Sequence, residues 1–244
     1  MELKYKRVLL KMSGEVLGSD KAPVDSAKVA EAAKHIKSLY DAGVQVGVVC
    51  GGGNIMRGRD SGTMDRNRAD AIGMLATAIN AMSLEQGLID AGVPVRVLSA
   101  VDIELFMDTY SARLANSALD NGEVVVFACG SGLPFFSTDT AAALRAAQIH
   151  ADALLLAKNI DGVYSADPKK DPSAVKYDTL TYDEVVEKQL RATDLTAITL
   201  CRDTDMRIVV FSMEDDSAFV RACMGENVGT PFLCAFATIP FGKL

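Results

Sequence analysis

Residues 44–54 read VQVGVVCGGGN, a valine-rich run that ends in three consecutive glycines and Asn54. The run predicts a buried strand, because valine packs well in a sheet that is covered on both faces. Glycines at the carboxyl end of such a strand leave backbone N–H groups open to an anion. This stretch therefore predicts a parallel sheet with a ligand site at its carboxyl edge.

Similar apolar runs recur along nearly the whole chain and alternate with stretches of helical length. They are rich in Val, Ile and Leu, and they lie at residues 7–12, 95–98, 123–129, 153–157, 207–212 and 228–233. This alternation is typical of the α/β class, in which helices cover both faces of a parallel sheet. No repeat or linker divides the chain, so we expect a single domain.

Helices are expected between these strands. One covers residues 25–43, with Asp25 as its N-cap and Gly43 as its stop. A longer helix is expected from Arg68 to Ala91, with an apolar face turned to the core or to another subunit. That face comprises Ile72, Leu75, Ile79, Met82 and Ile89. Asp139 is the candidate cap of an Ala-rich helix that ends near residue 150.

The 244 residues include 25 Lys and Arg against 32 Asp and Glu, a formal net charge of −7. A chain of this length buries roughly three quarters of its unfolded surface, so its core needs no disulfide or metal. The net acidic charge disfavours a nucleic-acid partner, because phosphate backbones are bound mainly by clustered Lys and Arg. An anionic ligand must then be met by local positive charge.

The five cysteines lie far apart and form no Cys-x-x-Cys pair, as is typical of buried thiols in a reducing compartment. Neither histidine has a cysteine or carboxylate at zinc-ligand spacing, so we expect no structural metal. The first apolar run stops at Lys11, and no uncharged run reaches the length of a membrane helix. These patterns predict a cytoplasmic protein that makes no membrane contact.

Four strand ends carry glycine or small polar residues, at positions 13–14, 51–53, 130–132 and 159–167. Together they favour a nucleotide or phosphate site, although a single glycine at such a turn often only allows a positive φ. Lys11 ends an apolar strand, where a lysine either faces an anion or reaches solvent. Arginines within residues 57–68 either clamp phosphates or pair with nearby aspartates.

The common fingerprints of several enzyme classes are missing. The chain has no G-x-x-x-x-G-K-[ST] run, and its glycine triplet lacks the G-x-G-x-x-G spacing. It also lacks a serine nucleophile elbow and an H-E-x-x-H run. Walker-type ATPases, ordinary dinucleotide dehydrogenases and hydrolases are therefore disfavoured.

Several motifs resemble the amino-acid kinase superfamily. They are Lys11-Met12-Ser13-Gly14-Glu15 and Val48-Val49-Cys50-Gly51-Gly52-Gly53-Asn54, with Arg57-Gly58 after them. Three further segments resemble the bacterial-type UMP kinases within that superfamily: residues 64–77, 134–139 and 161–168. The order and spacing of these motifs match the family from about Tyr5 to Thr230.

The resemblance implies a three-layer α/β/α sandwich with a mainly parallel central sheet. One amino-acid kinase-like domain would span residues 1–244, with acceptor binding in roughly 1–150, ATP binding in roughly 151–231 and an extra apolar tail at 232–244. The implied reaction moves the γ-phosphoryl group of MgATP to UMP and gives UDP and ADP. The implied assembly is a homohexamer.

The resemblance also implies catalytic roles. Lys11 would neutralise the transferred phosphoryl group, Arg57 would bridge the donor and acceptor phosphates, and Asp139 would orient Lys11 and help to hold magnesium. No residue is assigned firmly as a metal ligand, because ATP carries the Mg²⁺. Asp194 is a weaker candidate, expected to lie behind these residues.

Two sets of binding residues follow from the same resemblance. The implied ATP-binding set is Lys11, Met12, Ser13, Gly14, Gly53, Arg57, Lys158, Asn159, Tyr164 and Asp167. The implied UMP-binding set is Gly52, Asp70, Ser131, Gly132, Leu133, Pro134, Phe135, Phe136, Ser137 and Thr138. Asp70 would accept the ribose hydroxyls, because an ionised carboxylate is only an acceptor. Tyr164 would pack on the adenine or its sugar.

The chain departs from the family pattern in places. Leu133 stands where Asn is usual, and Ser131 and Ser137 stand where Thr is common. The family resemblance implies GTP as an activator and UTP as an inhibitor, but the matching segment over residues 15–24 is short. Arg96 matches an interface arginine of that regulatory region or is an ordinary exposed arginine.

Two rival functions stay open at this point. Another kinase of the superfamily would act on carbamate, glutamate or aspartate, which lack a ribose for Asp70 to bind. A nucleotide sensor without catalysis would use the same glycines, but it would need no group aimed at a transferring phosphoryl. The combination of Lys11, Arg57 and Asp139 favours catalysis.

Overall fold

The computed structural model describes residues 2–56, 62–190 and 193–233. Within these residues, nine strands form one sheet in the order β4-β3-β5-β2-β1-β6-β8-β9-β7. Each neighbouring pair is parallel except β8 with β9. The strands are β1 Arg7–Met12, β2 Gln45–Cys50, β3 Val95–Ser99, β4 Asp108–Thr109, β5 Val124–Ala128, β6 Ala153–Lys158, β7 Leu180–Thr181, β8 Arg207–Ser212 and β9 Gly229–Leu233.

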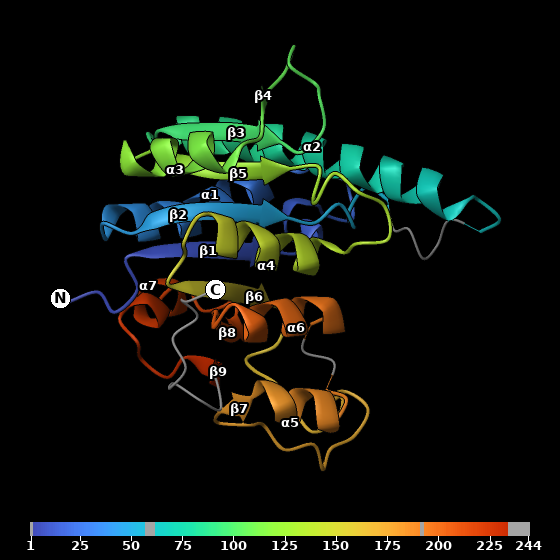
Figure 1. Ribbon diagram of the computed structural model, residues 1–244, viewed down its shortest axis with the longest axis vertical. Coiled ribbons are helices and arrows are strands. Elements are labelled where there is room, and N and C mark those ends of the chain that lie inside the picture. Colours follow the sequence, from blue (N-terminus) through green and yellow to red (C-terminus); the bar gives the residue numbers. More distant parts are fainter. Residues whose placement is uncertain (1, 57–61, 191–192, 234–244) are drawn as a thin grey trace, which may run out of the picture.

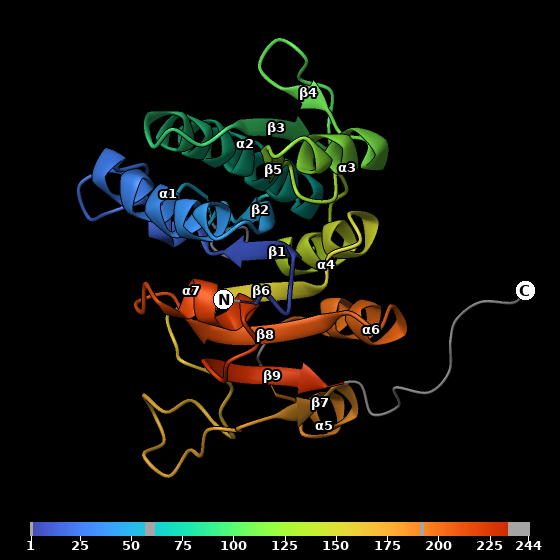
Figure 2. The same cartoon turned by 90° about the vertical axis from the view of Figure 1, so that its left-hand side faces the viewer.

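Helices cover both faces of this sheet, which confirms the predicted three-layer α/β/α sandwich (Figures 1 and 2). In chain order they are the 3₁₀ turn η1 Gly14–Leu17, α1 Ser26–Asp41, α2 Arg66–Asp90, α3 Ala112–Asp120, α4 Thr138–Gln148, α5 Tyr182–Glu187, α6 Leu195–Asp203 and α7 Ala218–Cys223. Helices α1, α2 and α7 lie on one face, and α3, α4 and α6 lie on the other (Figure 2).

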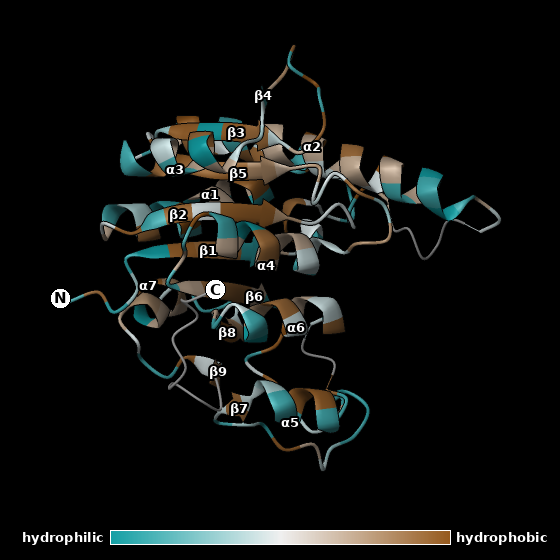
Figure 3. Ribbon diagram, viewed as in Figure 1, coloured by the Kyte–Doolittle hydropathy of each residue, from teal (hydrophilic) through white to brown (hydrophobic). Residues whose placement is uncertain are grey.

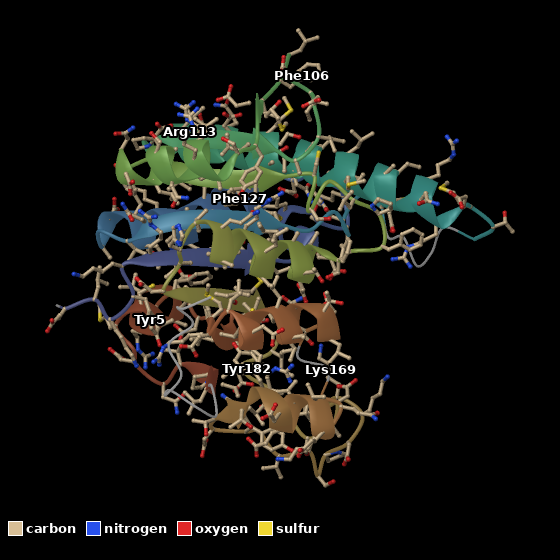
Figure 4. All side chains as sticks on the ribbon, viewed as in Figure 1. Tyr5, Phe106, Arg113, Phe127, Lys169 and Tyr182 are labelled. Atoms are coloured by element: carbon tan, nitrogen blue, oxygen red, sulfur yellow. The ribbon has the colours of Figure 1, made fainter. Side chains whose placement is uncertain are left out.

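The core lies in two layers on either side of the sheet. Strand β1 shows why, since Val8, Leu10 and Met12 pack into one layer while Leu9 packs into the other. Successive side chains of a strand point to opposite faces, so an apolar run of this kind suits a strand covered on both sides. The apolar strands accordingly occupy the middle of the molecule (Figure 3), and Phe127 of β5 lies among them (Figure 4).

The register of β1 brings three strand ends together. Met12 is level with Cys50 of β2 and with Ala157 of β6. The loops that follow these parallel strands therefore leave the sheet at the same edge. This edge is where a doubly covered sheet binds its ligands.

Strands at residues 7–12 and 207–212 form with the predicted bounds. Helix α2 begins earlier than predicted, at Arg66, because Asp65 caps it by accepting from the Arg68 N–H. The prediction that Asp139 caps α4 is wrong. Ser137 is the cap, with its hydroxyl accepting from the backbone of Asp139 and Thr140.

The apolar stripe predicted on α2 forms, but most of it faces outward. Leu75, Ile79, Met82 and Ile89 are between 41 and 54% exposed. The buried side of α2 consists mainly of small residues together with Leu84 and Leu88. Close approach to α1 explains this, because a Cβ at Gly87 would lie 2.8 Å from Cγ1 of Val29.

Cysteines 50, 129, 201 and 223 are buried, as predicted, while residue 234 lies outside the described residues. In the described part of the chain, every helix is too short or too polar to cross a bilayer. The same part holds no group of three or more His, Cys, Asp or Glu side chains arranged for a metal ion.

Candidate active site

A carboxylate between two lysines stands at the carboxyl edge of the sheet. The Lys11 ammonium, at the end of β1, lies 2.5 Å from Oδ1 of Asp139 in the first turn of α4. Lys158, at the end of β6, lies 3.5 Å from Oδ2 of the same carboxylate. The hydroxyl of Thr193 donates to that oxygen at 2.7 Å. Residues far apart in sequence thus form one partly buried charged cluster.

The electrostatics of this cluster favour an ionised carboxylate. Burial by itself would raise the pKa of Asp139, but the positive charges of Lys11 and Lys158 outweigh it and lower that pKa to about 2. Burial lowers the pKa of Lys158, an effect that Asp139 opposes and Lys11 reinforces. One carboxylate therefore faces two ammonium groups, and the cluster can accept further negative charge from a ligand.

Asp194 holds the helix that carries Asp139. Its carboxylate accepts from the hydroxyls of Ser137 and Thr140 at the start of α4, the latter at 2.9 Å. It also caps α6 by accepting from the Ala197 N–H at 2.8 Å. Asp194 thus ties the N-termini of α4 and α6 together.

The glycine loops after β1 and β2 pack directly on one another. A Cβ at Gly14 would lie 2.2 Å from the carbonyl oxygen of Gly51, so only glycine fits. Gly52 is pressed against α2, where a Cβ would meet the carbonyl oxygen of Gly73 at 2.9 Å. Gly53 is more open, with Glu15 the nearest neighbour of such a Cβ at 3.9 Å.

An amide pair missed by sequence reasoning holds the second of these loops. Asn80 of α2 is fully buried and donates to the Gly51 carbonyl at 2.7 Å. It also exchanges hydrogen bonds with Asn54, at 2.8 and 2.9 Å. A lone polar residue in an apolar helix pattern was the available signal, because a buried amide requires partners.

A cavity of about 200 Å³ lies between α2 and the loop after β5. Its lining brings together seven residues of the predicted UMP set: Gly52, Asp70, Ser131, Leu133, Phe136, Ser137 and Thr138. Asp70 of α2 joins the helix to the loop, because its carboxylate accepts from the Phe135 N–H at 2.7 Å. Within α2 the same carboxylate accepts from Nε of Arg66 at 2.8 Å. Leu133, Phe135 and Phe136 remain largely exposed.

A second, larger cavity of about 500 Å³ opens beyond the end of β6. Lys158, Tyr164 and Asp167 of the predicted ATP set line it, with Lys188 and Leu190 on the opposite wall. The Tyr164 hydroxyl donates to Asp161 at 2.9 Å. Asn159 lines a different, smaller cavity next to Glu15 and Met213.

The remaining predicted residues are placed as follows. Met12 buries its side chain in the core, so only its backbone can face a ligand. Ser13 and Gly14 begin the loop that touches Gly51. Arg57 lies outside the described residues. Arg96 pairs with Glu123 and Asp108, each at 2.9 Å, within its own chain.

The charged cluster borders both cavities. Thr138, next to Asp139, lines the smaller cavity, and Lys158, a partner of Asp139, lines the larger one. A cationic group between two pockets at the edge of a parallel sheet suits the transfer of an anionic group between two bound molecules. Fold and site together define a phosphotransferase of the α/β/α sandwich class.

Comparison with known proteins identifies the family. Residues 6–212 match the amino acid kinase family, and the chain belongs to that family. Among solved structures, a UMP kinase from Bacillus anthracis is 37% identical, with a TM-score of 0.91 over 95% of this chain and 97% of that one.

Two further structures show the same likeness. A UMP kinase from Ureaplasma parvum is 34% identical, with a TM-score of 0.89 over 95% of this chain and all of the other. A uridylate kinase from Archaeoglobus fulgidus is 32% identical, with a TM-score of 0.71 over 92% and 99% of the two chains. The likeness extends over nearly the full length of all three.

Proposed function

We propose that this protein is a UMP kinase, which transfers the γ-phosphoryl group of MgATP to UMP. An oxygen of the UMP phosphate bonds to the γ-phosphorus of ATP, and the bond from that phosphorus to its bridging oxygen breaks, leaving UDP and ADP. The observation that carries the proposal is the Lys11–Asp139–Lys158 cluster between two cavities. The three UMP and uridylate kinase structures give the acceptor its identity.

The smaller cavity takes UMP in this proposal. Asp70 reaches it from α2 and presents an acceptor to the ribose hydroxyls. The backbone of residues 130–138 borders the base, and Gly52 lets the phosphate approach the second loop. A nucleoside monophosphate explains the carboxylate and the loop together, whereas carbamate or an amino acid gives Asp70 no ribose to bind.

The larger cavity takes ATP, with Tyr164 and Asp167 beside its adenosine. Lys11 then contacts the phosphoryl group during its transfer. Its charge stabilises the negative charge spread over the phosphoryl oxygens, which is the main task of an enzyme in this reaction. Asp139 holds Lys11 in place at 2.5 Å, and Arg57 joins the two phosphates in our proposal.

Magnesium fits as a partner of the ATP phosphates. Mg²⁺ in such sites commonly keeps several waters and takes one or two carboxylates besides the phosphates. Asp139, ionised, next to Thr138 of the smaller cavity and paired with Lys158 of the larger one, is suited to be that carboxylate. When bound, the ion neutralises phosphate charge and orients the phosphates.

We further propose a homohexamer, activated by GTP and inhibited by UTP, in the cytoplasm. The exposed apolar stripe Leu75, Ile79, Met82 and Ile89 on α2 supports burial against another copy of the chain. Phe106, 66% exposed in a loop that projects beyond the sheet, supports a further contact (Figure 4). The buried free thiols of Cys50, Cys129 and Cys223 are in keeping with a reducing compartment.

The proposal is tested by measuring ADP release from MgATP with UMP, CMP, dUMP, carbamate, glutamate and aspartate in parallel, with and without GTP. We expect turnover with UMP and faster turnover with GTP. Turnover only with carbamate or an amino acid would show that this compound, and not UMP, is the acceptor. Binding of ATP without turnover in any mixture would instead indicate a nucleotide sensor.

The Lys11→Ala variant separates catalysis from binding. We expect UMP binding to persist and kcat to fall about 10³-fold, because the lost charge acts mainly in the transition state. Lys37→Ala is the matched control, since it removes an exposed lysine of α1 that pairs with Asp41 away from the site. Turnover that survives Lys11→Ala would refute the assigned role.

A further inference from the structure

Arg145 of α4 is a buried arginine next to the smaller cavity. Its side chain is 4% exposed, and its guanidinium carbon lies 3.7 Å from the centre of the Tyr110 ring. Nη1 donates to Oε1 of Gln148 at 2.7 Å, and Nη2 donates to the carbonyl oxygen of Gly130 at 3.1 Å. Tyr110 also donates to Gln148, at 2.5 Å.

This burial is unfavourable by itself. Burial lowers the pKa of Arg145, and no carboxylate in the described part of the chain pairs with it. Burying a cation without a carboxylate costs free energy unless hydrogen bonds and an aromatic face replace the water that it loses. Nε of Arg145 has no partner among the described residues, so the side chain is not fully satisfied. The contacts that Arg145 makes therefore show which groups it holds in place.

The contact with Gly130 holds the start of the loop that borders the cavity. Cys129 and Gly130 both have positive φ, 60° and 58°, an unfavourable conformation for the cysteine. The Cys129 N–H is bound by the Thr77 hydroxyl at 2.8 Å, and the Gly130 carbonyl is bound by Arg145. The two contacts pin this turn between α2 and α4. The chain then runs on to line the cavity with Ser131 and Leu133.

We propose that Arg145 is a positioning residue for the acceptor, which fixes the Gly130 turn so that residues 130–138 keep the shape that binds the nucleoside monophosphate. The inference rests on the proposed function of the smaller cavity. A guanidinium suits the task because its planar fork reaches Gly130 and Gln148 while its face stacks on Tyr110. A lysine presents one ammonium and no flat face.

The test is the kinetics of Arg145→Met and Arg145→Lys with UMP and with ATP varied separately. We expect KM for UMP to rise roughly tenfold in Arg145→Met, as for loss of a charged hydrogen bond. We expect a smaller rise in Arg145→Lys, and KM for ATP within about twofold of the wild-type value. Equal rises for both substrates, or no rise for UMP, would overturn the proposal.

Arg7→Lys is the matched control. Arg7 also donates to a backbone carbonyl, that of Ile149 at 3.0 Å, but it lies at the amino end of β1, away from the cavity. We expect it to lower stability without changing KM for UMP, and an effect equal to that of Arg145→Lys would overturn the proposal. If Arg145→Met fails to fold, Tyr110→Leu removes the stacked face and must raise the same KM. Failure of the wild type to use UMP would refute the proposed function instead.

Discussion

The ammonium of Lys11 lies 2.5 Å from the carboxylate of Asp139, and both side chains are less than one fifth exposed. The contact joins the carboxyl end of the central strand to the first turn of α4. Asp139 lies inside that turn, and Ser137, just before the helix, is the N-cap. The first turn of α4 thus contributes Asp139 to the charged cluster, while Ser137 accepts the hydrogen bonds of the free backbone N–H groups at the helix start.

The Lys11–Asp139 contact predicts a pH dependence of stability. The pKa of Asp139 falls from its ordinary value of 3.8 to about 2 in the folded protein. The resulting stabilisation, about 2 kcal/mol, is complete above the unfolded pKa and is lost as pH falls toward the folded one. We expect Asp139→Asn to be less stable by this amount near pH 5, and the difference to close by about pH 2.

Urea unfolding of both proteins at steps between these pH values measures the effect. The comparison with Asp139→Asn cancels the titration of the other carboxylates, because they are common to both chains. A stability difference that stayed constant from about pH 5 to pH 2 would show that Asp139 is not held ionised by the lysines.

The buried amide of Asn80 predicts a second stability effect. Asn80→Ala leaves the Gly51 carbonyl and Asn54 without their partner, and we expect a loss of about 2 to 4 kcal/mol. Asn80→Asp has nearly the same shape but turns an oxygen toward the Gly51 carbonyl. We expect it to be at least as destabilising in urea unfolding. A mild effect of Asn80→Asp would mean that packing, and not hydrogen bonding, holds the glycine loop.

Sequence patterns predicted the longer strands because burial on both faces leaves a continuous apolar run, as in residues 7–12 and 207–212. They predicted the glycine loops for the same local reason. The two-residue strands β4 and β7 have no such apolar run and were missed. Helix α2 was harder, since large apolar residues at helical spacing indicate one face without telling which surface covers it. Close packing of α2 against α1 requires small side chains at the contact, and the large apolar side chains lie on the exposed face of α2.

The site was predicted through motifs, and its supporting contacts were not. Asn80 and Arg145 act through backbone carbonyls of loops that lie 29 and 15 residues away in sequence. Nothing in their neighbouring residues indicates these partners. For Asn159 the motif predicted a shared site with its neighbour Lys158, but the two residues line different cavities.

The exposed stripe of α2 predicts an effect on assembly. A glutamate at Ile79 would place a charge in the middle of a surface that we propose to be buried between copies. We expect Ile79→Glu to lower the molar mass measured by sedimentation at micromolar concentration. Val175→Glu is the control, because Val175 is 66% exposed in the segment between β6 and β7, which lies far from α2 (Figure 1). An unchanged mass in Ile79→Glu would remove α2 from the interface.

The last prediction concerns the ribose-binding role that we propose for Asp70. Its carboxylate lines the smaller cavity and is 17% exposed, so a ribose can reach it. Asp70→Asn keeps an oxygen for the Phe135 N–H but loses the charge and half of the acceptor capacity. We expect kcat/KM for UMP to fall roughly tenfold to a hundredfold, and the preference for UMP over dUMP to shrink toward one. Arg66→Gln removes the ion pair at 2.8 Å but leaves the carboxylate, so it should keep that preference. If Asp70→Asn weakened UMP and dUMP equally, Asp70 would be acting by holding the 130–138 loop and not by binding the 2′-hydroxyl.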